Sequence, residues 1–155
     1  MAIFTAAQAL EMAMEIEQNG EIFYKKAAEQ SDDPATQALF EDLAQQEMAH
    51  YETFQRLAGD VERAPGKPGE EYDQYEMYLN VALENALFTG PEKALALAKK
   101  AADRETALRA AMGFEKDTLL FFYDLRDMVS EKDQETISTI IREEKRHLRR
   151  LSKLL

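Results

Sequence analysis

Two short stretches decide the fold: residues 42–54 read DLAQQEMAHYETF, and residues 140–151 read IIREEKRHLRRL. Each contains a Glu followed three residues later by a His, which are Glu47 with His50 and Glu144 with His147. Residues i and i+3 lie on one face of an α-helix, so each pair projects from its helix in a single direction. Apolar residues share that face, so both pairs are expected to point into a core.

The composition and periodicity of the whole chain predict helices. Of 155 residues only six are Gly and four are Pro, while residues that favour helices are abundant. Apolar stripes at spacings of three and four residues predict four long helices, at about residues 5–30, 34–58, 103–128 and 131–154. Residues 1–155 are therefore expected to form one all-α domain, with two antiparallel helix pairs joined by a long crossover.

The crossover is expected at residues 59–102, because its first part is the only Pro- and Gly-rich stretch of the chain. Two short helices are predicted within it, one near residues 72–86 and one from Pro91. Asp33 is expected to cap the second long helix, with Pro34 as its first residue. Ser130 is expected to cap the fourth.

The two halves of the chain repeat one another. The Glu-x-x-His pair recurs after 97 residues, and Glu17 of the first predicted helix recurs after 98 residues as Glu115 of the third. In each predicted hairpin these residues lie about 15 positions from the turn, so at 1.5 Å per residue they meet roughly 20 Å from it. Six side chains are therefore expected to converge, namely Glu17, Glu47, His50, Glu115, Glu144 and His147.

Such a cluster favours metal binding. Burying four carboxylates against two imidazoles without compensation costs too much free energy to be tolerated. Two divalent cations would bring four positive charges against four carboxylates, with neutral imidazoles as further ligands. Oxygen and nitrogen ligands of this kind suit iron or manganese. The competing interpretation is structural, with each His hydrogen-bonded in a core and each Glu paired with a basic residue.

Other features of the composition exclude whole classes of function. The chain has no Cys, which rules out disulfides, thiolate metal sites and thiolate nucleophiles. Its net charge of -11 is the wrong sign for binding nucleic acid or an anionic membrane. No apolar run approaches the length of a membrane span, and the N-terminal residues do not resemble a signal peptide. A cytoplasmic location is expected.

The ligand pattern resembles that of the ferritin-like carboxylate proteins. Four stretches resemble the rubrerythrin-like branch of that superfamily: EIEQNGEIFYKKAAE at residues 15–29, ALRAAMGFEKDTLLFFYDL at residues 107–125, and the two stretches quoted first. The resemblance implies a ferritin-like four-helix bundle with two iron ions, for which manganese or a mixed pair is an alternative. It also implies a homodimer that reduces hydrogen peroxide.

The resemblance further implies roles for individual residues. Glu17 and His50 would bind one metal and Glu115 and His147 the other, with Glu47 and Glu144 as bridges. Apart from the resemblance, Tyr24 and Tyr123, each in an aromatic pair after the first Glu of its half, are candidates to orient carboxylates or donate a proton, and the alternative is that both only pack in the core.

Two departures from rubrerythrins bear on the reaction. Rubrerythrins carry a rubredoxin domain with four Cys that supplies electrons, so a chain without Cys needs a separate electron-donor protein such as a rubredoxin. Thr118 stands where rubrerythrins have a second Glu, three residues after the first Glu of the third helix.

Three functions follow from these observations. The first is a di-iron oxidoreductase that acts on hydrogen peroxide or dioxygen. The second is a ferroxidase that oxidises iron and passes it on. The third is a metal-free helical interaction module.

Overall fold

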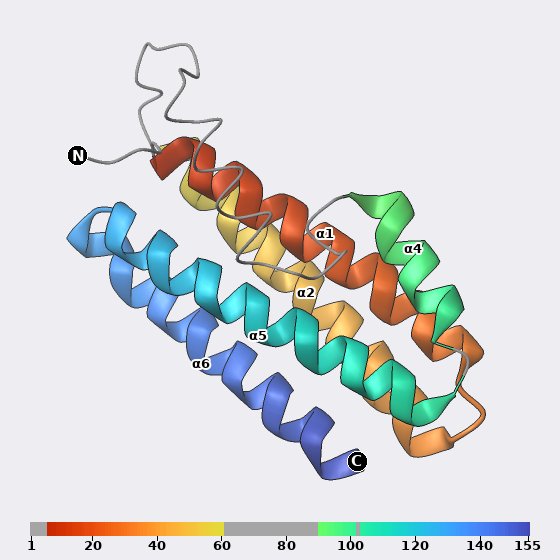
Figure 1. Ribbon diagram of the computed structural model, residues 1–155. Coiled ribbons are helices and arrows are strands. Elements are labelled where there is room, and N and C mark those ends of the chain that lie inside the picture. The colour runs from red at the N-terminus through yellow and green to blue at the C-terminus, as the bar shows by residue number, and fades with distance from the viewer. Residues whose placement is uncertain (1–5, 61–89, 102) are drawn as a thin grey trace.

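Two long helical hairpins form the body of the molecule (Figure 1). The computed structural model describes residues 6–60, 90–101 and 103–155. The first hairpin pairs α1 (Ala6–Gln30) with α2 (Pro34–Asp60), and the second pairs α5 (Arg104–Met128) with α6 (Glu131–Leu154). These ranges contain no strand, and the all-α fold predicted from the sequence is confirmed.

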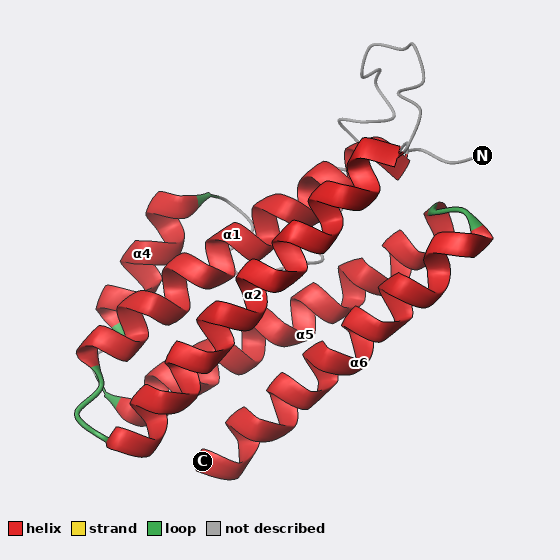
Figure 2. Cartoon of the chain, turned by 180° about the vertical axis from the view of Figure 1, so that it is seen from behind, coloured by secondary structure: helices red, strands yellow, loops and turns green. Residues whose placement is uncertain are grey.

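The two hairpins pack against each other to complete a four-helix bundle. α1 contacts α5 and α2 contacts α6, while each helix also contacts its own hairpin partner (Figures 1 and 2). Every helix therefore presents one face to a shared interior. Side chains from α1, α2, α5 and α6 at one level along the bundle can meet there.

A shorter helix, α4 (Pro91–Lys100), packs on the outer side of α1. Gly90 precedes it with φ of 124°, a conformation that L side chains rarely adopt, and Pro91 supplies the fixed φ of the first turn. The Gln30 side chain at the end of α1 donates to the Ala98 carbonyl at 2.7 Å. The second short helix expected, near residues 72–86, lies outside the described residues.

Polar side chains fix where the helices begin. Asp33 accepts a hydrogen bond from the Thr36 amide at 3.0 Å, as expected for the cap of α2, and Asp103 accepts from the Thr106 amide at the start of α5. Ser130 is the N-cap residue of α6, as expected, but its side chain does not cap the helix. Its hydroxyl donates to the Asp133 carboxylate at 2.8 Å and accepts no backbone N–H.

The interior is filled largely by aromatic rings. The largest fully buried side chains include Phe23, Tyr24, Phe40, Phe54, Phe114, Phe121 and Phe122. Ring centroids lie 5.8 Å apart for Tyr24 and Phe40 and 5.1 Å apart for Phe54 and Phe122. Burial of these rings supplies much of the hydrophobic stabilisation of the bundle. It also keeps water away from any polar group among them.

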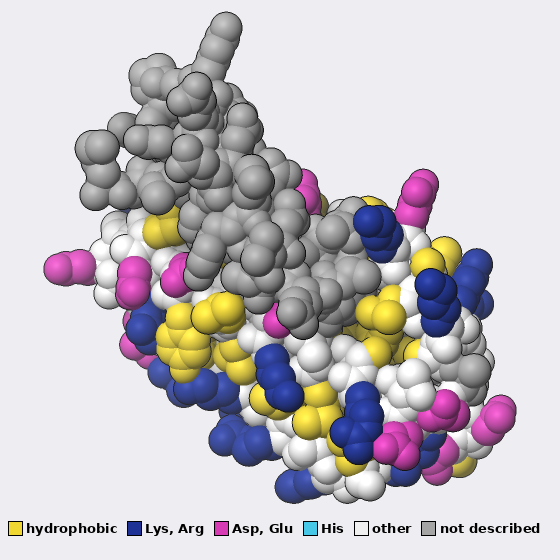
Figure 3. All heavy atoms as spheres, viewed as in Figure 1, with side chains coloured by type: hydrophobic (Ala, Val, Ile, Leu, Met, Phe, Trp, Pro, Cys, Tyr) yellow, Lys and Arg dark blue, Asp and Glu magenta, His cyan; other side chains and the backbone are white. Residues whose placement is uncertain are grey.

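The surface is highly charged. Lys and Arg side chains are interspersed with Asp and Glu on the face shown in Figure 3. Among the described helices, none combines the length and apolar character needed to cross a lipid bilayer.

Candidate metal centre

The structure brings all six side chains of the sequence-based cluster together in the centre of the bundle. Glu17 comes from α1, Glu47 and His50 from α2, Glu115 from α5, and Glu144 and His147 from α6. Five of these residues are 0% exposed and His50 is 4% exposed. Ionisable groups are rarely buried so completely unless something compensates their charge.

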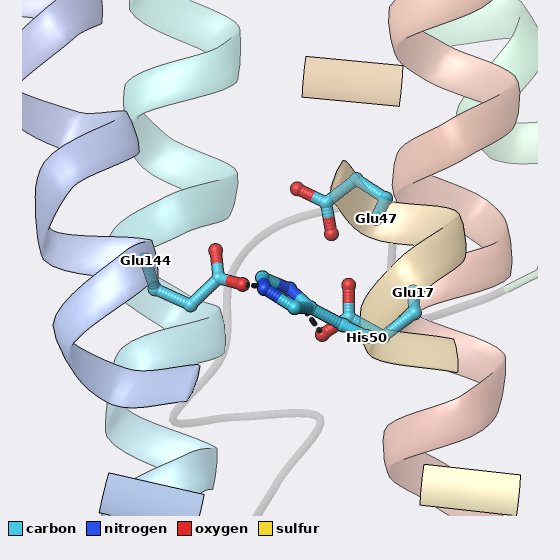
Figure 4. A group of neighbouring side chains, drawn as sticks. All are labelled: Glu17, Glu47, His50 and Glu144. Atoms are coloured by element: carbon cyan, nitrogen blue, oxygen red, sulfur yellow. Dashed lines mark ion pairs between the residues drawn. The ribbon is translucent and has the colours of Figure 1, made fainter. Parts of the chain in front are cut away.

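The cluster divides into two overlapping groups that share two carboxylates. One group contains Glu17, Glu47, His50 and Glu144, whose side chains all point toward one another in Figure 4. The other contains Glu47, Glu115, Glu144 and His147. Within each group, one potential ligand atom per residue lies within 4.8 Å of all the others. Glu47 and Glu144 belong to both groups, which is the arrangement that bridging carboxylates require.

Both imidazoles direct Nδ1 toward the carboxylates. His50 Nδ1 lies 2.6 Å from Glu144 Oε1 and 3.6 Å from Glu17 Oε1. His147 Nδ1 lies 3.1 Å from Glu144 Oε2, 3.5 Å from Glu47 Oε1 and 3.6 Å from Glu115 Oε1. The two rings are stacked with their centroids 5.7 Å apart. Each group therefore offers one nitrogen ligand beside its oxygens.

The outer nitrogen of each imidazole is held by the opposite hairpin. His50 Nε2 lies 2.6 Å from Glu143 Oε2, and His147 Nε2 lies 2.7 Å from Gln46 Oε1. Such contacts fix the orientation of a ligating imidazole and the position of its proton. Neither residue was predicted from the sequence, although Gln46 and Glu143 directly precede Glu47 and Glu144 at the same 97-residue repeat.

Gln46 is itself held in place by a polar chain that reaches the surface. Its amide group donates to Asp42 Oδ2 at 2.8 Å, and Arg150 donates to the same oxygen at 2.6 Å. Because the Gln46 nitrogen faces Asp42, its oxygen faces His147 and accepts the Nε2 proton. This chain connects α2 to α6.

Several inward-facing carboxylate oxygens lack hydrogen-bond partners. Both oxygens of Glu17 and Glu47 and one oxygen of Glu115 are buried without a hydrogen bond to any described residue, whereas Nδ1 of His50 and of His147 lie 2.6 and 3.1 Å from Glu144. Buried polar atoms are nearly always satisfied in native proteins, and each exception needs an explanation. These atoms all belong to the cluster, and a bound cation would satisfy them.

Burial and mutual repulsion raise the pKa values of three of the carboxyl groups. Burial raises the pKa of Glu47 well above its ordinary value, and the charges of Glu17 and Glu144 raise it further. Burial and the charge of Glu144 raise the pKa of Glu115 well above its ordinary value. The pKa of Glu17 is also raised, mainly by burial. In the absence of cations these groups therefore favour the protonated form.

Glu144 and the two histidines, by contrast, have pKa shifts that favour their charged forms. Burial alone would raise the pKa of Glu144, but the charge of His50 and hydrogen bonding lower it well below its ordinary value. Burial would lower the pKa of both imidazoles, yet the surrounding carboxylates raise both of them. Without metal, these shifts therefore favour an ionised Glu144 and protonated imidazoles.

Of the two tyrosines named from the sequence, only Tyr24 reaches the cluster. Its fully buried hydroxyl donates to Glu115 Oε1. Tyr123 lies elsewhere, with its ring 5.1 Å from the Arg126 guanidinium and 5.2 Å from Lys145 Nζ. The reason is helical register, because Tyr24 follows Glu17 by seven residues, whereas Tyr123 follows Glu115 by eight. The counterpart of Tyr24 is Phe122, which has no hydroxyl.

Two small residues occupy equivalent positions one turn beyond the first Glu of each half. A Cβ on Gly20 would lie 2.9 Å from the Phe114 ring and 3.3 Å from Cδ of Glu47, so only Gly leaves room for both. Thr118, the equivalent residue of α5, is fully buried, and its hydroxyl has no partner among the described residues. The interior next to the cluster is therefore tightly packed on one side and polar on the other.

This donor set fits a di-nuclear metal site. It provides four carboxylates and two imidazoles in two groups, with two carboxylates common to both. Two divalent cations would balance the charge of the four carboxylates and would replace the protons that these groups otherwise hold. Oxygen and imidazole ligands are those that iron and manganese accept.

Comparisons with known proteins agree with this geometry. A family model described as Rubrerythrin matches residues 3–63, a region that includes Glu17, Glu47 and His50. No curated protein matches the chain. The chain is similar to a solved structure from Thermotoga maritima, described as that of a candidate ferritin-like diiron-carboxylate protein. The match has 26% sequence identity and a TM-score of 0.67, and it covers 97% of this chain and 94% of that chain.

The family match covers the first hairpin, and the structural match covers nearly the whole bundle. The same bundle holds the two overlapping groups of carboxylate and imidazole side chains. Together these findings show a ferritin-like four-helix bundle whose first hairpin is similar to the rubrerythrin family.

Proposed function

We propose that this protein is a di-iron oxidoreductase that reduces hydrogen peroxide, or dioxygen, with electrons from a separate donor protein. The observation that carries the proposal is the pair of overlapping ligand groups that share Glu47 and Glu144. A purely structural cluster would have paired its carboxylates, whereas here both oxygens of Glu17 and of Glu47 are buried without a hydrogen bond to any described residue. Iron is the metal named for the similar protein from Thermotoga maritima.

The burial of the cluster favours a small substrate. Every ligand side chain is at most 4% exposed, so a bulky molecule could not reach the ligand atoms without displacing helices. When bound, two ferrous ions supply one electron each, as the two-electron reduction of a peroxide O–O bond requires. Reduction of one hydrogen peroxide to two water molecules also consumes two protons.

Tyr24 is the residue that we assign to orient Glu115 in this reaction. Burial and the neighbouring Glu115 raise its pKa well above the ordinary value, so its hydroxyl keeps its proton and remains a hydrogen-bond donor. The hydroxyl also holds one oxygen of Glu115, which fixes the direction of that carboxylate. The aromatic side chains of Phe40 and Phe114 pack around the Tyr24 ring and restrict its movement.

The electrons must come from outside these 155 residues. The chain contains no Cys, so it has no thiolate-bound metal centre that could pass electrons to the bundle interior. We propose a small redox protein such as a rubredoxin as the donor. We also propose a cytoplasmic location, and a homodimer, which the resemblance to rubrerythrins supports.

Rapid mixing of the ferrous protein with oxidants tests the reaction. Metal-free protein is loaded anaerobically with two equivalents of ferrous ion and mixed with hydrogen peroxide or with dioxygen. We expect peroxide to oxidise the centre faster, and we expect turnover when reduced rubredoxin is present. A protein with Glu47→Ala, which lacks a shared carboxylate, should show neither.

The other outcomes identify the alternative functions. Accumulation of a ferric mineral beyond two irons per chain, without turnover on a reductant, would establish iron handling instead. If protein expressed with iron contained no metal, both metal-based functions would be excluded, and an interaction module would remain.

A further inference from the structure

The two halves of the metal centre are supported by different residues. Glu143 holds His50 from outside the cluster, and Gln46 holds His147 in the equivalent position. One partner is a carboxylate and the other is a neutral amide. The repeat that relates the two hairpins is therefore broken at the residues that hold the imidazoles.

The carboxylate strengthens the nitrogen ligand of its own group. An ionised Glu143 accepts the Nε2 proton of His50 and directs electron density toward Nδ1, which faces the cluster. It also adds a negative charge 2.6 Å from the imidazole. Gln46 offers no charge, and the carboxylate behind it, Asp42, is paired with Arg150.

The two groups also differ at a carboxylate. Tyr24 donates to one oxygen of Glu115, so that this carboxylate has only one oxygen without a partner. Glu17, its counterpart in the other group, keeps both oxygens without partners, because the residue equivalent to Tyr24 is Phe122. Glu17 can therefore offer both of its oxygens to a cation, whereas Tyr24 already holds one oxygen of Glu115.

We infer that the two metal positions are unequal, and that the position of Glu17 and His50 binds the first divalent cation more tightly than the position of Glu115 and His147. This inference rests on the proposed metal centre. Glu143 is the positioning residue that sets the difference, and Gln46 is its neutral counterpart. Loss of such an outer partner typically weakens metal binding by about 10- to 100-fold.

The two histidines make the order of binding directly measurable. Because the chain contains only two His, protein labelled with ¹⁵N-histidine gives four ring-nitrogen signals, which His147→Gln assigns to the two rings. Metal-free full-length protein is titrated with Zn²⁺ as a diamagnetic probe. We expect the first equivalent to shift Nδ1 of His50 and the second to shift Nδ1 of His147.

Substitution of Glu143 and Gln46 tests whether these residues cause the difference in metal affinity. Glu143→Gln should weaken the tight step in calorimetry by about 10-fold or more and bring the two steps together. Gln46→Glu should tighten the weak step while the protein still folds, which keeps the test open if Glu143→Gln is unstable. Glu52→Gln removes a charge from the exposed face of α2 and serves as the control, with both steps unchanged.

The outcomes separate this inference from the proposed function. If two Zn²⁺ ions bind but both histidines shift in parallel, or His147 shifts first, the inference is overturned and the di-nuclear centre stands. If no Zn²⁺ binds and neither ring signal moves, the metal centre itself is refuted, and the inference with it.

Discussion

His50 Nδ1 lies 2.6 Å from Glu144 Oε1, a contact that joins α2 of the first hairpin to α6 of the second. In the metal-free protein this contact is an ion pair between an imidazolium and a carboxylate. A metal ion that binds Nδ1 must displace the imidazolium proton. Protons and metal ions therefore compete for the same atoms at the centre of the bundle.

The first prediction concerns the pH dependence of the metal-free protein. Glu47 and Glu115 titrate in the folded state above their ordinary value of 4.5, and His50 titrates above its ordinary value of 6.5. A raised pKa stabilises the fold below the unfolded value and loses that effect as pH rises through the folded value. The lowered pKa of Glu144 has the opposite effect on stability, but that effect changes only below pH 4.5. The melting temperature should therefore fall from pH 6 to pH 9.

Metal should reverse this trend. Because a cation binds deprotonated ligands, the rise in melting temperature caused by manganous ion should be larger at pH 8 than at pH 6. Thermal unfolding followed by circular dichroism measures both effects. An equal rise at the two pH values would contradict the exchange of protons for metal.

The second prediction concerns the shared carboxylates. Either Glu47→Ala or Glu144→Ala should abolish the spectrum of the paired metal ions, because each residue belongs to both ligand groups. Glu41→Ala, on the exposed face of the same helix as Glu47, should leave two ions bound. Elemental analysis and the absorption spectrum provide the measurement. A similar loss in the Glu41 variant would argue against the inward-facing assignment.

The third prediction concerns Tyr24. Tyr24→Phe removes the hydrogen bond to Glu115 but keeps the packed ring, so the metal-free protein should lose about 1 kcal/mol of stability. Peroxide-dependent oxidation of the ferrous protein should slow, while two ions still bind. Tyr123→Phe should change stability by less than about 0.5 kcal/mol. Equal effects of the two variants in chemical denaturation would remove the special role of Tyr24.

The fourth prediction compares two helical glycines. A methyl group on Gly20 would press on Phe114 and Glu47, so Gly20→Ala should destabilise the protein by about 1–3 kcal/mol. Nothing lies within 4 Å of a Cβ on Gly59, so Gly59→Ala should stabilise α2 by about 0.4–1 kcal/mol. Denaturant midpoints of the two variants should move in opposite directions. A stabilising Gly20→Ala would mean that the Phe114 ring yields easily.

The fifth prediction compares two buried threonines. The Thr118 hydroxyl has no partner among the described residues, so Thr118→Val should leave the metal-free protein equally stable or stabilise it by about 1 kcal/mol. The Thr36 hydroxyl accepts from Arg104 and contacts Asp33, so Thr36→Val should cost about 1 kcal/mol. Thermal unfolding distinguishes the two. Strong destabilisation by Thr118→Val would reveal a partner for its hydroxyl.

The helices and the convergence of the six ligands could be predicted because both follow from periodicity. Helical spacing fixes which residues share a face, and the repeat of 97–98 residues places the two sets at one level. The same arithmetic, applied strictly, also excludes Tyr123, since seven residues make almost two full helical turns, whereas eight residues overshoot two turns by about 80°. The aromatic pairs Phe23–Tyr24 and Phe122–Tyr123 look equivalent in the sequence, although their tyrosines differ by one residue in spacing from the preceding Glu.

The outer partners of the imidazoles could not be predicted in this way. Gln46 and Glu143 do not share a helical face with the Glu that follows them, and their positions depend on how the two hairpins pack. An Asp such as Asp42 is expected from the sequence to be a solvated surface residue, yet it accepts hydrogen bonds from Gln46 and Arg150. Contacts between hairpins are decided by the fold, and a single helix does not reveal them.

Each ligand group takes three residues from one hairpin and its fourth from the other, Glu144 in one case and Glu47 in the other. A single hairpin that paired with an identical copy would therefore hold both groups by symmetry. Duplication and fusion of one ancestral hairpin gene would suffice to produce this chain. Once the halves were joined, each could evolve separately, and differences such as that between Gln46 and Glu143 could arise in one half without being copied in the other.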